Sequence, residues 1–235
     1  KTKTGYAITM PPPSSGGICL AQIQRLMRDF SIKTSEVGSP RHLHLMAECM
    51  RRSFADRNEY LGDPDFIDCQ MDLLLSESHL EKMARSIDPL KATSSKSLIS
   101  DESLPKESEQ TTHYSVVDRH GNGVAVTTTL NGSFGSKVLV PGAGFLLNNE
   151  MDDFTSRPGV PNLFGLVQGK PNGISPGKRP LSSMSPTVCL SEGGPDAEEV
   201  LSVLGTPGGP TIITNVFQVL YALDHLELSP ELAVT

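Results

Sequence analysis

The sequence predicts a chain of the α+β class, because the spacing of its apolar residues is helical in the first part and changes to that of strands at Thr111. Over residues 1–88, apolar residues recur three and four positions apart, as they do on one face of an amphipathic helix. Residues 89–110 are rich in Ser, Lys and Glu and carry little to bury, which indicates a linker. From Thr111 onward, apolar and polar residues alternate with the two-residue period of β-strands. A chain of 235 residues is long enough to bury a sizeable core.

Composition and charge exclude several classes of function. The net charge is −7, and acidic and basic residues are mixed, so no basic stripe offers a surface for nucleic acid. No apolar run approaches the roughly 20 residues of a membrane span. The histidines are dispersed and no Cys-x-x-Cys pair occurs, so we predict neither a metal site nor a cofactor. The cysteines are expected as buried, unpaired small hydrophobes: Cys19, Cys49, Cys69 and Cys189.

The first residues predict a short strand followed by a helix. Tyr6–Met10 is strand-like and stops at three prolines, whose nitrogens cannot donate hydrogen bonds. Ser14–Gly17 then supplies cap and turn residues ahead of a helix. The apolar face of this helix comprises Ile23, Leu26, Met27 and Phe30.

Two further helices are predicted before residue 88. Ser39 and Pro40 combine an N-cap with a proline at the first helical position. The apolar face that follows comprises Leu43, Met46, Ala47, Met50 and Phe54. Residues 56–65 are crowded with carboxylates but lack the ligand spacing of a calcium loop, so we interpret them as a helix end with solvated charges. The third helix is predicted over Leu75–Ile87.

The second half of the chain predicts two hairpins and a long loop. Tyr114–Thr128 forms one hairpin around a polar turn, and the second hairpin pairs residues 186–190 with 199–204. Phe145–Leu147 is predicted as a short strand. Arg157–Gly177 is a loop rich in Pro, Gly and Asn, of the kind that serves as a lid or a binding segment.

A glycine-rich turn joins the second hairpin to another helix. Gly205–Pro210 precedes an apolar helical segment that begins at Ile212, so backbone amides and the helix dipole meet at this turn. Such a turn can hold an anion or an oxyanion, and glycine can equally serve only to permit a tight turn. No Gly-Lys-Ser/Thr follows, which excludes a P-loop. Ser229 and Pro230 predict the start of a last helix.

Thr111 is the residue around which we organise a functional hypothesis. It stands where the linker gives way to a strand, and a threonine hydroxyl becomes a nucleophile only when a base activates it. Its own α-amino group is the nearest base, and this group is released only if the Gln110–Thr111 bond is cut. The alternative interpretation is that Thr111 and Thr112 simply begin an edge strand, where Thr is a favoured residue.

Several segments, in the same order along the chain, resemble motifs of the γ-glutamyltranspeptidase family. Thr111–Asp118 is similar to the start of the small subunit of these enzymes. The other segments are Met10–Gly17, Tyr60–Asp65, Leu147–Phe154, Lys178–Thr187 and Gly205–Gly209. The resemblance therefore extends through nearly the whole chain.

The resemblance implies an N-terminal-nucleophile hydrolase fold, an αββα four-layer sandwich of which this segment is a part. Residues 1–88 are then the C-terminal part of the large-subunit region, residues 89–110 a flexible linker ending at the autocleavage site Gln110–Thr111, and residues 111–235 the N-terminal part of the small catalytic subunit. The two subunits form a heterodimer. The family also implies periplasmic or extracellular placement.

The implied reaction is γ-glutamyl transfer, or hydrolysis of glutathione and other γ-glutamyl compounds, through a γ-glutamyl-Thr111 intermediate. Water, an amino acid or a dipeptide is the acceptor. Thr129 resembles the threonine that hydrogen-bonds the nucleophile, and Gly208 and Gly209 match the oxyanion-hole glycines. The residues expected to hold the glutamyl α-amino group are Asn131, Glu150 and Asp153, and those expected to hold its α-carboxylate are Ser182 and Ser183.

Two departures from the family pattern stand out. The large-subunit arginine expected to pair with the α-carboxylate lies outside this sequence, and the lid-like loop has Phe164 where several bacterial relatives carry Tyr. Two alternatives also remain open. One is a glutaryl or cephalosporin-type acylase of the same fold, against which the α-amino-binding acids Glu150 and Asp153 argue. The other is an uncleaved, catalytically inert homologue or fragment.

Overall fold

The computed structural model describes residues 2–98, 111–157, 160, 169–192 and 199–234. Gln110, with residues 99–109 of the predicted linker, lies outside these ranges, as do residues 158–159 and 161–168 of the predicted lid loop, Phe164 among them. The strands are β1 (Gly5–Ile8), β2 (Thr111–Val117), β3 (Gly123–Thr129), β4 (Thr187–Ser191) and β5 (Val200–Leu204). The helices are α1 (Gly16–Asp29), α2 (Pro40–Tyr60), α3 (Met71–Leu74), α4 (Glu77–Arg85), α5 (Ser95–Leu98), α6 (Thr211–Asp224) and α7 (Pro230–Ala233). Three short 3₁₀ helices complete the set: η1 (Thr34–Glu36), η2 (Glu150–Asp153) and η3 (Lys170–Asn172).

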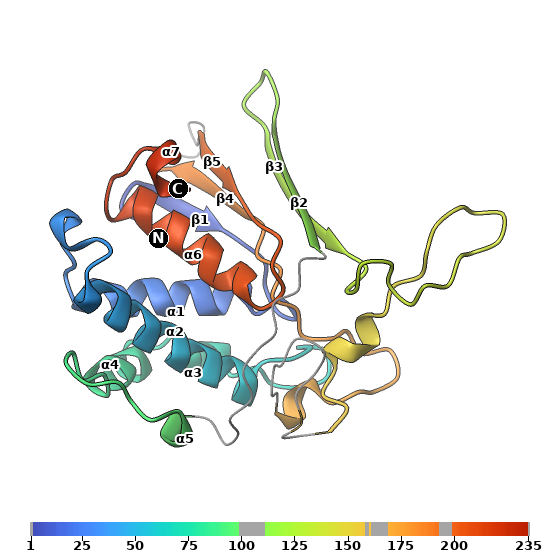
Figure 1. The fold of residues 1–235 in the computed structure, drawn as a ribbon, viewed down its shortest axis with the longest axis horizontal. Helices are drawn as coiled ribbons and strands as arrows, with labels where there is room; N and C mark the ends of the chain where they lie inside the picture. Colours follow the sequence, from blue (N-terminus) through green and yellow to red (C-terminus); the bar gives the residue numbers. More distant parts are fainter. Residues whose placement is uncertain (1, 99–110, 158–159, 161–168, 193–198, 235) are drawn as a thin grey trace.

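The main sheet has three antiparallel strands in the order β1-β4-β5. The predicted hairpin of residues 186–204 is confirmed, since β4 pairs with β5. The predicted strand at Tyr6–Met10 is confirmed as β1, which pairs with β4 from the other side. Helices α1 and α6 lie along one face of this sheet, and α2 packs on α1 (Figure 1).

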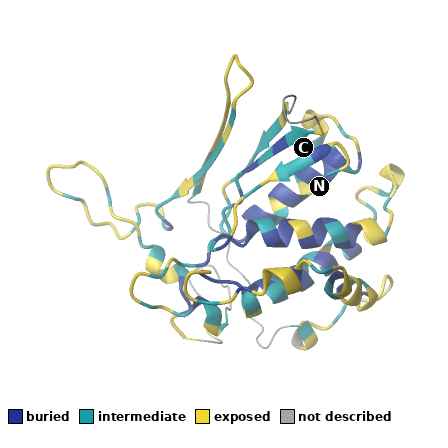
Figure 2. Cartoon of the chain, turned by 180° about the vertical axis from the view of Figure 1, so that it is seen from behind, coloured by how far each residue is buried: buried dark blue, intermediate teal, exposed yellow. Residues whose placement is uncertain are grey.

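The main core cluster lies among the helices. Its buried side chains come mainly from α1, α2, α4 and α6. Ile23, Leu26 and Met27 of α1 have no exposed surface, and Ile213 and Phe217 of α6 are equally buried. The four cysteines are buried and unpaired, as predicted. Figure 2 shows the buried residues concentrated in α1, α2 and α6.

The predicted inner face of α2 is wrong at two positions. Leu43 and Ala47 are exposed, whereas Met46, Met50 and Phe54 are partly buried against the core. The most buried stripe of this helix instead carries polar residues: His42, Glu48, Arg52, Ser53 and Arg57, beside Leu45 and Cys49. Hydrophobic periodicity misses this stripe because its charges are satisfied by hydrogen bonds inside the protein.

The hairpin of β2 and β3 stands apart from the main sheet (Figure 1). Its register places Thr111 opposite Thr129 and Tyr114 opposite Val126. Asp118 closes the turn, since its carboxylate accepts hydrogen bonds from the backbone N–H groups of His120 and Asn122. Tyr114, Val116 and Val124 on one face of the hairpin are exposed, and on the other face the hydroxyl of Ser115 donates to the carbonyl of Val203 in β5.

Two element boundaries differ from the sequence prediction. Phe145–Leu147 forms a single bridge, between Leu146 and Leu139, rather than a strand. The third predicted helix begins at Glu77 instead of Leu75, because the hydroxyl of Ser76 caps it by accepting from the N–H of His79. The described residues form a mixed α+β unit, and the full four-layer sandwich is not present among them.

Candidate active site

A cavity of about 400 Å³ opens where the hairpin meets the N-terminal end of α6. Sixteen residues line it, and they include eight of the nine predicted catalytic and substrate-binding residues. The eight are Thr111, Thr129, Asn131, Glu150, Asp153, Ser182, Ser183 and Gly209. Gly208 is adjacent in the chain but is not part of the lining. The structure thus brings together side chains from segments that are more than 70 positions apart.

Thr111 is the first residue of β2, and it lies directly opposite Thr129 in the hairpin. Directly opposed residues have Cβ atoms about 4.5–5.5 Å apart, so their side chains are neighbours on one face. The hydroxyl of Thr129 accepts a hydrogen bond from the N–H of Asn131 at 2.9 Å. Asn131 is buried in the left-handed conformation (φ 71°), and its amide donates to the carbonyl of Asn149 at 3.2 Å. The end of the hairpin is therefore tied to the segment that leads into η2.

Glu150 and Asp153 occupy the first and last positions of η2. Residues three apart in a 3₁₀ helix eclipse one another, which places both carboxyl groups on one side. Burial raises the pKa of Glu150, and the charge of Asp153 and the hydrogen bond that protonated Glu150 donates to the Asp153 carboxylate raise it further. Burial also raises the pKa of Asp153, against the opposing effects of the hydrogen bond from Glu150 and the charge of Arg57. From these directions we expect the pair to hold one proton near neutral pH, on Glu150 rather than on Asp153.

A buried asparagine that the sequence analysis missed fixes η2 to the opposite wall. Asn172 is 1% exposed; its amide donates to the carbonyl of Asp153 at 2.6 Å, and its oxygen accepts from the N–H of Leu181 at 2.8 Å. Asn172 lies in the loop predicted as a lid, where nothing in the sequence distinguishes it from its polar neighbours. It sets the separation between the carboxylates and the two serines.

Ser182 and Ser183 lie on a segment held by the residues that follow the three prolines. Ser14 and Ser182 form a parallel bridge, and the carbonyl of Ser182 accepts from both the N–H and the hydroxyl of Ser15, at 2.8 and 2.7 Å. The hydroxyl of Ser14 donates to the carbonyl of Met184 at 2.5 Å. A Cβ atom on Gly16 would lie 2.1 Å from the hydroxyl oxygen of Ser185, so only glycine permits this close approach.

Gly208 and Gly209 form the turn into α6. Their φ angles are 133° and 54°, a region that L side chains rarely adopt. Their carbonyls accept from the N–H groups of Thr211 and Ile212, whereas no described residue accepts from their own amides. Since these amides lie at the positive end of the helix dipole, the turn can stabilise negative charge.

The prediction that residues 56–65 are a helix end with solvated charges is wrong at Arg57 and Asp63, whereas Glu59 and Asp65 are exposed. Arg57 is 1% exposed and lines the cavity, and the side chain of Asp63 has no exposed surface. The carboxylate of Asp63 accepts from the backbone N–H of Arg179 at 2.8 Å and from its guanidinium at 2.9 and 2.5 Å. These contacts, led by the hydrogen bond from Arg179, hold the pKa of Asp63 well below its usual range.

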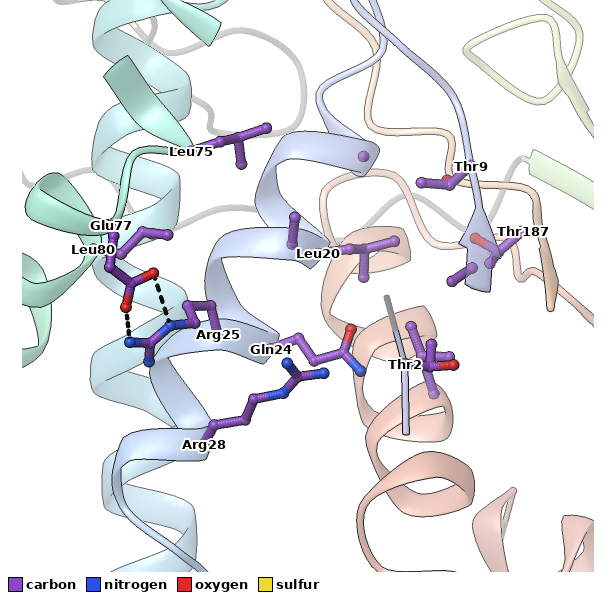
Figure 3. A pocket seen from close by; sticks show the side chains of 14 residues that line it. Thr2, Thr9, Leu20, Gln24, Arg25, Arg28, Leu75, Glu77, Leu80 and Thr187 are labelled. Atoms are coloured by element: carbon purple, nitrogen blue, oxygen red, sulfur yellow. Dashed lines mark hydrogen bonds and ion pairs between the residues drawn. The ribbon is translucent and has the colours of Figure 1, made fainter. Parts of the chain in front are cut away.

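A second cavity of about 350 Å³ lies between α1, α4 and β1 (Figure 3). It contains none of the predicted site residues. Its central cation, Arg25, is already paired with Glu77 and Asp29. The cavity at Thr111 is therefore the better candidate for chemistry.

The described residues contain neither a metal-binding cluster nor a membrane-spanning helix. Among them, no three His, Cys, Asp or Glu side chains lie so that they could hold a metal ion. In the part of the chain that the structure describes, no helix combines the length and apolar character needed to cross a bilayer.

Comparison with known proteins identifies the family. The family model described as Gamma-glutamyltranspeptidase matches residues 2–235. The chain is 47% identical over 223 residues to the glutathione hydrolase proenzyme of Escherichia coli K12. The alignment covers 94% of this chain and 38% of that protein. It is 46% identical over 228 residues to the glutathione hydrolase proenzyme of Pseudomonas aeruginosa, covering 96% of this chain and 39% of that protein. The chain thus spans well under half the length of these relatives.

A solved structure supports the fold. The cephalosporin acylase from Bacillus halodurans matches with a TM-score of 0.72 and 20% sequence identity, covering 97% of this chain and 37% of that chain. Identity this low indicates a shared fold and nothing about substrate. Since the family model matches almost every residue, and relatives near 46% identity match the same span, this chain belongs to the γ-glutamyltranspeptidase family.

Proposed function

We propose that the protein transfers or hydrolyses γ-glutamyl groups, from glutathione and related compounds, through a γ-glutamyl-Thr111 intermediate. One observation carries the proposal: Thr111 shares a cavity with a carboxylate pair on one wall and two serines on another. A γ-glutamyl group ends in an ammonium and a carboxylate on one carbon. Carboxylates and an amide oxygen suit the ammonium, and hydroxyl donors suit the carboxylate.

The nucleophile must first be released. In the proposed maturation, the hydroxyl of Thr111 attacks the carbonyl of Gln110, the peptide nitrogen leaves as the α-amine of Thr111, and water hydrolyses the resulting ester. An α-amine has a reference pKa of about 7.7–8.0 and can therefore accept the hydroxyl proton near neutral pH. Residues 1–88 with the linker 89–110, and residues 111–235, then belong to the large and small subunits of one heterodimer.

Turnover then proceeds in two half-reactions. The hydroxyl of Thr111 attacks the γ-carbonyl of the donor and passes its proton to the α-amine, which returns the proton to the leaving amine. The amides of Gly208 and Gly209 stabilise the oxyanion, and one such donor contributes about 2.7–4 kcal/mol. Water, an amino acid or a dipeptide removes the glutamyl group. Thr129 orients the nucleophile from the neighbouring strand.

The carboxylate pair favours this substrate class over the acylase alternative. A glutaryl side chain has no α-ammonium, so its binding would take Asp153 out of contact with water without giving it an ammonium partner, which is unfavourable. Glutaryl anilide is therefore expected to be turned over far more slowly than γ-glutamyl anilide. Family resemblance alone supports placement outside the cytoplasm.

The proposal is tested on the full-length protein with three samples. Wild type incubated at neutral pH should give two masses, the second beginning at Thr111, and should hydrolyse γ-glutamyl anilide. Thr111→Ala should remain uncut and inactive. Thr112→Ala is the matched control, because it makes the same change at the next, exposed position and should be cut and active. Cleavage or turnover by the Thr111→Ala protein would exclude Thr111 as the nucleophile.

A further inference from the structure

We infer that Arg57 is a positioning residue for donor recognition, which acts through the hydroxyl of Ser183 rather than by reacting itself. The inference rests on the proposed function, since it assigns Ser183 to the substrate carboxylate. Arg57 belongs to none of the family motifs named above. It is also distinct from the large-subunit arginine that is expected to pair with the substrate carboxylate. Arg57 reaches the cavity from the last turn of α2, where its backbone is fixed by the helix.

The guanidinium of Arg57 is held in one orientation by three separate acceptors. Nε donates to the hydroxyl of Ser15 at 2.8 Å, one terminal nitrogen donates to the side-chain oxygen of Asn58 at 3.2 Å, and the other donates to the hydroxyl of Ser183 at 3.1 Å. Because the group is planar, these contacts also fix the direction from which Ser183 is approached. A lysine at this position keeps the charge but cannot reproduce the fork.

The contact decides where the proton of Ser183 points. A serine hydroxyl has one proton and two lone pairs. Arg57 has no acceptor, so it occupies a lone pair of Ser183 and leaves the proton to be donated elsewhere. No described residue accepts a hydrogen bond from this hydroxyl, and Ser183 lines the cavity. The hydroxyl is thus set to donate into the cavity.

Ser182 is prepared in the same way by a different donor. Its hydroxyl accepts from the N–H of Met184 at 3.1 Å. The hydroxyls of two adjacent serines therefore each accept a hydrogen bond from the protein. Each is left free to donate its proton into the cavity that both residues line. A pair of aligned hydroxyl donors fits a carboxylate, which accepts on two oxygens.

Arg57 also supplies a fixed positive charge between the two ends of the site. Burial lowers its pKa, and the negative charge of Asp153 opposes this shift. An arginine stays protonated in proteins, so the cation is permanent. It favours a carboxylate beside the serines and helps to keep Asp153 ionised for an ammonium. Both effects concern binding of the donor and leave the chemistry at Thr111 unchanged.

The test compares Michaelis constants for γ-glutamyl anilide in the full-length protein. Arg57→Lys and Ser183→Ala should each raise KM by about 10-fold or more, with a smaller change in kcat, because each removes a hydrogen bond that serves a charged group. The double variant should raise KM no more than the more affected single variant does. Both changes remove the same series of contacts, from Arg57 through Ser183 to the substrate carboxylate. The inference would be overturned if the double variant raised KM by the product of the two single increases. A loss confined to kcat would also overturn it.

Arg52→Lys is the matched control. Arg52 is equally buried on α2 and binds Glu48 and Ser86, but it does not line the cavity. This variant should be less stable with an unchanged KM. A rise in KM equal to that of Arg57→Lys would assign the effect to helix packing and refute the specific role.

A milder variant keeps the test decisive if Arg57→Lys does not mature. Asn58→Ala removes only the acceptor of one terminal nitrogen and should mature normally while raising KM about threefold. An unchanged KM in mature Asn58→Ala would contradict the inference. Failure of the proposed function would appear differently, as an active Thr111→Ala protein or an inactive wild type.

Discussion

The two carboxylates of η2 are expected to have unequal roles at neutral pH. We expect the shared proton on Glu150, so Glu150→Gln should exchange one neutral hydrogen-bond donor for another of similar shape. Asp153→Asn removes the remaining negative charge from a largely buried position. A hydrogen bond to a charged group contributes about 1.5–3 kcal/mol, which corresponds to about 10- to 150-fold in affinity.

At pH 7 we therefore expect Asp153→Asn to lower kcat/KM for γ-glutamyl anilide by about 10- to 150-fold. Glu150→Gln should change it by less than about threefold, because the amide donates to Asp153 as the protonated acid does. Both variants should be cut normally, which intact mass spectrometry measures in the same samples. Equal losses, or a larger loss in Glu150→Gln, would refute the assignment of the proton to Glu150.

Three further predictions concern stability. The pKa of Glu150 is raised in the folded state, so the contribution of this residue to stability is present at low pH and is lost as the pH rises. Glu150→Gln should therefore raise Tm at pH 8.5 but not at pH 4. Asp63→Asn should lower the free energy of unfolding in urea by about 1–3 kcal/mol, since it disrupts buried acceptors of Arg179, and a loss below about 0.5 kcal/mol would contradict this. Gly205→Ala should destabilise the protein and displace the hairpin, because the added Cβ atom would lie 2.0 Å from the ring of His113; an unchanged Tm would show that the ring moves freely.

Elements with a single clear periodicity could be predicted from the sequence. The apolar face of α6 and the alternation in β4 each leave one buried side, and the structure places them accordingly. The face of α2 could not be predicted in the same way. Its buried stripe contains Arg52 and Arg57, and burial of a charge depends on partners that are distant in the sequence, Ser86 in one case and Ser183 in the other.

The candidate site followed from family motifs rather than from local chemistry. A carboxylate pair such as Glu150 and Asp153, taken alone, is indistinguishable from a solvated turn. Arg57 and Asn172 were missed because their importance comes from what they contact across the cavity. The sequence states the residue type and its position in the chain, but the tertiary structure decides which residues form hydrogen bonds, such as Arg57 with Ser183 and Asn172 with Asp153.

The pairing of Asp63 with Arg179 has a consequence for how related chains can diverge. Each partner lies on a different side of the Gln110–Thr111 bond, so the proposed cut would place them on separate polypeptides. A change at either residue alone leaves the charge of the other without its partner. A change at both that keeps them complementary can be tolerated. Pairwise covariation is therefore expected between these positions, and halves taken from two diverged relatives should assemble only when their pairs agree.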